Sequence, residues 1–220
     1  MGTVQYLLAR PRPPDDILTV SALLEPDRFV PAPALLEWIR TAYLDDEGSL
    51  FTEEHSHLAA AKIGCLWTTA ENMRRGQRIV GFAELGNTIG GRQGKWQKGR
   101  AEQQVREWFG YEPDFLITFD ALHADQTDDA SFCALVDHEL FHCAQAKDKF
   151  DQPRFNKATG EPIWGIRGHD LEEFVAVVRR FGVQAAAPAA TDLVIAAAKK
   201  PEIAAAKLAR ACGTCIAKAA

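Results

Sequence analysis

Apolar side chains recur along this chain at spacings that predict both helices and strands. Helices are predicted where apolar positions lie three or four residues apart. The predicted helices cover residues 33–43, 53–67, 97–110, about 131–147 and 169–181. Short, mostly apolar runs bounded by turn residues predict strands. The predicted strands cover residues 78–85 and 115–119. The pattern therefore predicts one domain with helices around a small number of strands.

The two ends of the chain differ in composition from this middle part. Residues 1–33 form a Pro-rich arm, and residues 183–220 combine a linker with an Ala- and Lys-rich tail of high helix propensity. The tail carries five basic and two acidic side chains, and it contains a lone C-x-x-C pair. We therefore predict a central domain over residues 34–182, flanked by an arm and a helical extension.

The predicted helix near residue 140 contains the pattern H-E-x-x-H, formed by His138, Glu139 and His142. On a helix, residues four apart lie on the same face, so both imidazoles point the same way. Two imidazoles so placed can hold one Zn²⁺ at about 2.0–2.1 Å. Glu139 lies about 100° round the helix, outside the ligand set but within reach of a water at the ion. This arrangement suits metal-assisted hydrolysis with Glu139 as general base.

A catalytic zinc site usually takes three protein ligands, so a third ligand must come from elsewhere in the chain. His169 is the favoured candidate, because it precedes a predicted helix and follows Gly168. Glu172 or Glu173 could bind the ion instead, or could orient the His169 ring. Asp170 is a further alternative. His55 and His57 are two residues apart and diverge on a helix, which favours surface positions or local hydrogen bonds over a metal site.

Bulk properties narrow the class of protein. The 220 residues are 47% hydrophobic and 25% charged, as in an ordinary globular protein, and the net charge of −5 does not favour a nucleic-acid binder. No apolar run reaches the about 18 residues of a membrane span. No signal peptide is evident at the N-terminus, so a cytoplasmic location is expected. The five cysteines follow no framework spacing and are expected to be reduced.

Three stretches together resemble a known family, the putative phage metallopeptidase domain of phages and prophages. They are the strand at 115–119, the segment 134–143 that contains H-E-x-x-H, and the segment 169–174. The layout is also similar to SprT-like and Spartan-type proteases, which supports His169 as third ligand. The resemblance implies an α+β, minimal zincin fold, with several helices and a small antiparallel sheet. It implies hydrolysis of peptide bonds in a bacterial or phage-infected cell.

Other functions stay open at this point. One alternative is a non-catalytic zinc-binding scaffold, in which Glu172 or Glu173 completes a closed site. Another is an adaptor that contacts nucleic acid through the basic tail, although five dispersed charges form no dense patch. The expected partner is a peptide or protein substrate, and the expected cofactor is Zn²⁺. The polar connection 148–168, which joins the motif to the third ligand, is predicted to form one wall of a substrate cleft.

Overall fold

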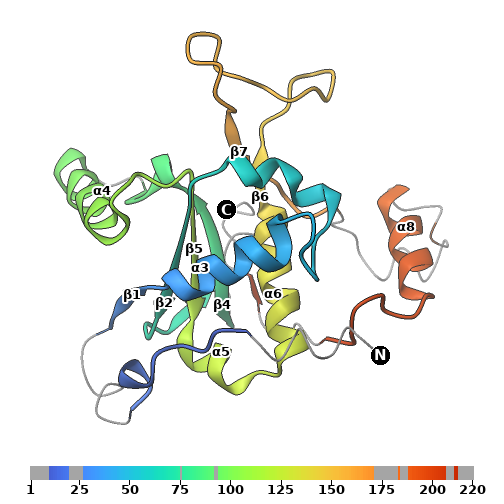
Figure 1. Ribbon diagram of the computed structural model, residues 1–220, viewed down its shortest axis with the longest axis horizontal. Helices are drawn as coiled ribbons and strands as arrows, with labels where there is room; N and C mark the ends of the chain where they lie inside the picture. The colour runs from blue at the N-terminus through green and yellow to red at the C-terminus, as the bar shows by residue number, and fades with distance from the viewer. Residues whose placement is uncertain are drawn as a thin grey trace.

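A mixed β-sheet forms the centre of the computed structural model (Figure 1). The structure describes residues 10–19, 27–74, 76–91, 94–170, 183, 188–206 and 211–212. The strand order is β1-β2-β5-β4-β3, and β8 also pairs with β4. The strands are β1 (Phe29–Pro31), β2 (Ile63–Thr68), β3 (Asn72–Arg74), β4 (Gln77–Leu85), β5 (Phe115–Asp120) and β8 (Ala211–Cys212).

The α+β class is confirmed, and the main sheet is mixed rather than purely antiparallel. Strands β2 and β5 run parallel, and so do β4 and β8, whereas the other pairs are antiparallel. A parallel pair needs a long crossover connection. Here the chain between β2 and β5 contains β3, β4 and helix α4 (Lys95–Phe109), which provide that length.

Helices cover both faces of the sheet. Helices α3 (Pro33–Ile39) and α6 (Asp129–His142) pack on one face and form the larger apolar core with side chains of the sheet. Helix α4 packs on the other face through Val105, which joins a smaller core with Leu66 and Leu116. Alternate residues of a strand point to opposite faces, so Ile117 enters the first core and Leu116 the second.

The predicted helix over 53–67 is wrong in its second half. A 3₁₀ helix, η3 (Glu53–Ala60), is followed by strand β2, of which every residue is buried. Periodicity does not separate a short, fully apolar run in a central strand from a buried helix. Four other predicted elements are found: helix α3 continues as a π-helical turn, η2 (Arg40–Leu44), and α4, β4 and β5 lie where predicted.

Helix α6 carries the H-E-x-x-H motif, and its start is fixed by a side-chain cap. The Asp128 carboxylate accepts hydrogen bonds from the backbone N–H of Ser131 at 2.9 Å and from its hydroxyl at 2.8 Å. These bonds hold the pKa of Asp128 below its usual value. The helix begins two residues before the predicted start and ends at His142, not near Lys147 as predicted. The chain leaves the helix there because it turns directly into strand β6 (Cys143–Gln145).

The connection after the motif is a long hairpin rather than an irregular loop. Strand β6 pairs antiparallel with β7 (Trp164–Ile166), and isolated bridges join Lys147 to Pro153 and Phe155 to Pro162. In Figure 1 the hairpin projects away from the sheet beyond β6 and β7. Its base returns the chain to the end of α6, where the N–H of Arg167 donates to the carbonyl of His142 at 2.9 Å.

The described parts of the two ends are more ordered than their composition suggests. Arg10 is 4% exposed, forms an ion pair with Asp129 at 2.7 Å, and lies 4.3 Å from the centre of the Phe132 ring. In the tail, helix α8 (Pro188–Ala197) agrees with the predicted helicity, but Ala211 and Cys212 form a strand. The predicted helix over 169–181 lies almost entirely outside the described residues. Within the described ranges, no helix has the length and apolarity needed to cross a membrane.

Short helical elements complete the described part of the fold. These elements are η1 (Asp15–Ile17), η4 (Gly86–Thr88) and α5 (Ala121–Gln126).

Burial raises the pKa of Glu84, in β4, from 4.5 to about 7. Between these two values the folded protein holds a proton that the unfolded chain has lost, so stability falls as the pH rises through this window.

We expect Glu84→Gln to stabilise the protein above pH 7 by about 1–3 kcal/mol, because each pKa unit corresponds to about 1.4 kcal/mol. Near pH 4, where both states of the wild type are protonated at Glu84, the two proteins should unfold at similar urea concentrations. Urea unfolding at both pH values measures this difference. Glu71→Gln, at an exposed position, is the matched control. A Glu84→Gln protein no more stable than wild type at pH 8 would contradict the assignment.

Candidate metal centre

Three imidazole rings converge at the end of helix α6. His138 and His142 lie one helical turn apart on the same face, as their spacing predicts. The Nε2 atoms of His142 and His169 each lie 3.2 Å from the Nε2 atom of His138. The structure therefore brings together all three histidines predicted as ligands.

The backbone of Arg167 fixes the orientation of the His142 ring. The carbonyl oxygen of Arg167 lies 2.7 Å from Nδ1 of His142, so Nδ1–H donates to it and Nε2 carries the lone pair. Such a bond sets the tautomer and is a usual feature of metal-binding histidines. The Arg167 N–H binds the carbonyl of the same residue. The base of the hairpin thus holds His142 by two hydrogen bonds, one to its ring and one to its backbone carbonyl.

The surroundings of His138 keep it in the neutral form that binds metals. Burial, and to a smaller extent the neighbouring His142 and His169, lower the pKa of His138 from 6.5 to about 4. A metal ligand must be deprotonated, so protons compete weakly for His138.

Glu139 lies beneath the histidines, against strand β4. The side chain is fully buried, and a Cβ atom at Gly81 would lie 2.7 Å from its Oε1 atom. A side chain at position 81 would therefore displace the carboxyl group of Glu139 from the position it has here. A glycine inside a strand often marks such a close approach. Glu139 thus faces strand β4 from helix α6, one residue after His138 and three before His142.

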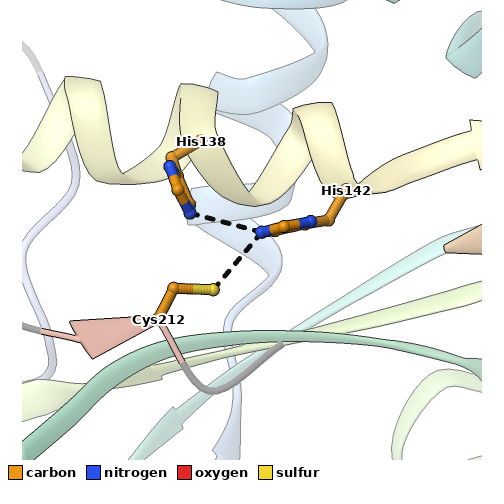
Figure 2. A group of neighbouring side chains, drawn as sticks. All are labelled: His138, His142 and Cys212. Atoms are coloured by element: carbon orange, nitrogen blue, oxygen red, sulfur yellow. Dashed lines mark hydrogen bonds between the residues drawn. The ribbon is translucent and has the colours of Figure 1, made fainter. Parts of the chain in front are cut away.

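A cysteine from the C-terminal tail lies at the same place (Figure 2). The Sγ atom of Cys212 is 3.4 Å from Nε2 of His142, and the donor atoms of His138, His142 and Cys212 all lie within 4.8 Å of one another. Strand β8 brings it there, because Cys212 pairs with Gly81 of β4. Gly81 is the residue that also lies against Glu139.

The donor atoms fit a tetrahedral zinc ion. With bonds of about 2.0–2.1 Å to nitrogen and about 2.3 Å to sulfur, tetrahedral geometry separates two nitrogens by about 3.3 Å and a nitrogen from the sulfur by about 3.6 Å. The observed separations are 3.2 Å and 3.4 Å. Imidazole and thiolate donors favour Zn²⁺ over Mg²⁺ or Ca²⁺, which bind oxygen ligands.

The remaining candidates take other positions. The Asp170 carboxylate accepts a hydrogen bond from Arg167 at 2.6 Å, and Glu172 and Glu173 lie outside the described residues. His55 is buried, not at the surface, and binds Asp137 at 2.8 Å, whereas His57 binds the carbonyl of Cys143 at 2.9 Å. Both histidines therefore make long-range hydrogen bonds, His55 to a side chain of α6 and His57 to the backbone at the start of β6, and not the local hydrogen bonds that were expected.

Two cavities open beside the histidines. The smaller, about 230 Å³, is lined by side chains that include His138, His142, His169 and Asp170. The larger, about 750 Å³, lies along both strands at the base of the hairpin, and Glu54 and Arg167 line both cavities. The base of the segment 148–168 is therefore next to the site, where a cleft wall was predicted.

Two residues of the site were missed by the sequence interpretation. Gly81 carried a signal, since glycine interrupts an otherwise apolar strand. Cys212 was interpreted as half of a weak C-x-x-C pair, and nothing local to it indicated a histidine partner 70 residues earlier. Cys65, Cys133, Cys143 and Cys212 form no disulfide, as expected.

Comparison with known proteins gives one match. No curated protein and no solved structure matches this chain. A family model described as putative phage metallopeptidase matches residues 36–199, which is more than half of the chain and includes the three histidines and Glu139. The chain therefore belongs to the putative phage metallopeptidase family.

Proposed function

We propose that this protein is a zinc-dependent peptidase in which His138, His142 and His169 hold the ion and Glu139 is the general base. The observation that carries the proposal is that the Nε2 atoms of His142 and His169 each lie 3.2 Å from that of His138, next in sequence to the fully buried Glu139. Family membership supports metal-dependent peptide hydrolysis, and the donor set favours zinc among the common ions.

The roles of the side chains follow from their positions. When bound, the ion lowers the pKa of a coordinated water and polarises the scissile carbonyl. Glu139 accepts the proton of the attacking water and passes it to the leaving amine, as a carboxylate within hydrogen-bond reach can do. Gly81, which has no side chain, leaves room for this carboxyl group against strand β4. Arg167 keeps the His142 ring in its ligating orientation.

The shape of the site favours an extended peptide as substrate. The larger cavity follows the strands at the base of the hairpin, where residues 144–147 and 165–167 line it. Backbone groups at the rim of a small sheet can pair with an extended chain. Arg167 lies between this cavity and the histidines, so a peptide in the cavity would reach the ion past it.

A second candidate function is a closed, structural zinc site. The observation that favours it is Cys212, whose sulfur joins His138 and His142 in a group of donor atoms that lie within 4.8 Å of one another. Structural zinc sites have four protein ligands, whereas catalytic sites keep one position for water. The buried Glu139 favours the catalytic alternative, since a closed site has no use for a carboxyl group at this position.

Metal removal tests the proposed function. Protein purified with zinc is expected to cleave an unfolded protein substrate, to lose this activity on treatment with a chelator, and to recover it when stoichiometric Zn²⁺ is added back. Product fragments are identified by mass spectrometry, and bound metal is measured by elemental analysis. Cleavage that continues after the metal has been removed would contradict the proposal.

A further inference from the structure

The C-terminal strand β8 places a thiol beside two of the histidines of the metal centre. Cys212 lies 3.4 Å from His142 Nε2, close to the separation of two ligands of one zinc ion. The thiol reaches this place through the sheet, because β8 runs parallel to β4 and Cys212 pairs with Gly81. We propose that Cys212 is a detachable fourth zinc ligand, by which the tail closes the active site. This inference rests on the proposed function.

The thiol is suited to compete with water for the ion. A thiolate is the form of cysteine that binds metals, so the Cys212 thiol releases its proton to solvent when its sulfur binds. The sulfur then takes the position that a catalytic zinc site otherwise keeps for water. Glu139 lies against Gly81, the residue of β4 that pairs with Cys212. While the sulfur is bound, Glu139 has no metal-bound water to activate. The metal centre is therefore inactive while Cys212 is bound to the ion.

Several features indicate that this ligand is detachable. The three histidines and Glu139 lie within the region shared with the family, 36–199, whereas Cys212 lies beyond it. The pairing of β8 with β4 is irregular between Ile79 and Gly81. Cys212 is partly exposed, whereas Glu139 is fully buried and His142 is 2% exposed. The thiol is therefore more accessible than the two groups of helix α6, and the strand that carries it is irregularly paired.

Cobalt substitution tests the ligand directly and does not depend on activity. Protein loaded with Co²⁺ is expected to show a thiolate-to-cobalt charge-transfer band that is absent in Cys212→Ser and retained in Cys215→Ser, the matched control from the same segment. Metal content should stay at one ion per chain in both variants, because three histidines remain. Absence of a Cys212-dependent band, or loss of the ion from Cys212→Ser, would overturn the proposal.

Thiol alkylation gives a second measurement that needs no change at Cys212. In a Cys215→Ser background, iodoacetamide should modify Cys212 much more slowly with Zn²⁺ bound than after chelation. Cys65, Cys133 and Cys143 are buried, and burial raises the pKa of Cys65 to about 12 and of Cys133 to about 11, so these thiols react little. Equal alkylation rates with and without zinc would contradict coordination by Cys212.

Peptidase assays then test closure. A tethered ligand at millimolar effective concentration, with a dissociation constant of about 0.1 mM, leaves the site open about a tenth of the time. Cys212→Ser is therefore expected to cleave peptide about tenfold faster than wild type, with Cys215→Ser unchanged. Equal rates in Cys212→Ser and wild type would overturn closure by the tail. If neither protein cleaves peptide but the cobalt band depends on Cys212, the proposed function fails and the ligand assignment stands.

Discussion

Replacing Glu139 by glutamine is expected to lower peptide hydrolysis about 10²–10⁴-fold, the usual contribution of a general base. Glutamine has nearly the same shape, so it should fit the space beside Gly81, but its amide cannot accept the proton of the attacking water. Zinc content and thermal stability should stay close to wild type, because the three histidines are unchanged. Steady-state kinetics and metal analysis of the same preparation measure both quantities.

Glu54→Gln is the matched control for this change. Glu54 lines the same cavity as the histidines, but its side chain is exposed, so the substitution should leave the rate nearly unchanged. A Glu139→Gln protein with wild-type activity would show that another group accepts the proton. A Glu139→Gln protein without zinc would show that this carboxyl group holds the centre together rather than acting on water.

His138→Ala is expected to remove the ion and the stability that the ion provides. His138 lies between the other two rings, with both of their Nε2 atoms 3.2 Å from its own. An ion that binds only the folded state adds about 3–4 kcal/mol when its concentration is 100–1,000 times its dissociation constant. The variant should therefore show no zinc-dependent rise in its melting temperature, and no peptidase activity.

His57→Ala controls for the loss of a histidine near the same helix. His57 binds the carbonyl of Cys143 and lies outside the group of donor atoms, so this variant should keep its zinc. Calorimetric melting curves with and without added Zn²⁺ separate the two variants. Equal zinc-dependent stabilisation of His138→Ala and wild type would show that the ion binds elsewhere.

Sequence patterns predicted the structure correctly where a feature depends on residues that are close together in one helix. The i, i+4 spacing of His138 and His142 fixes their common face on any helix, and the structure keeps that face. The predicted helix over 97–110 ends at a glycine, a common helix stop, and Gly110 ends α4 with a positive φ of 74°. These features depend only on chain geometry within a few residues.

The sequence pattern predicted the wrong secondary structure where burial in the sheet decided between a helix and a strand. Residues 63–68 are apolar at nearly every position, so their pattern fits a buried helix as well as a central strand. Pairing with β1 on one side and β5 on the other settles the choice, because each backbone group finds its hydrogen-bond partner there. Neither partner strand is near in sequence.

The sequence by itself determined that His138, Glu139 and His142 lie together on one helix, and it predicted two ligands and a general base from their spacing. It left several candidates for a third ligand, and the tertiary structure places His169 beside His138. The tertiary structure alone placed Gly81 under Glu139 and Cys212 beside His142. The reason is physical: those contacts depend on sheet pairing between distant segments, and no periodicity within a segment encodes the register of such pairs.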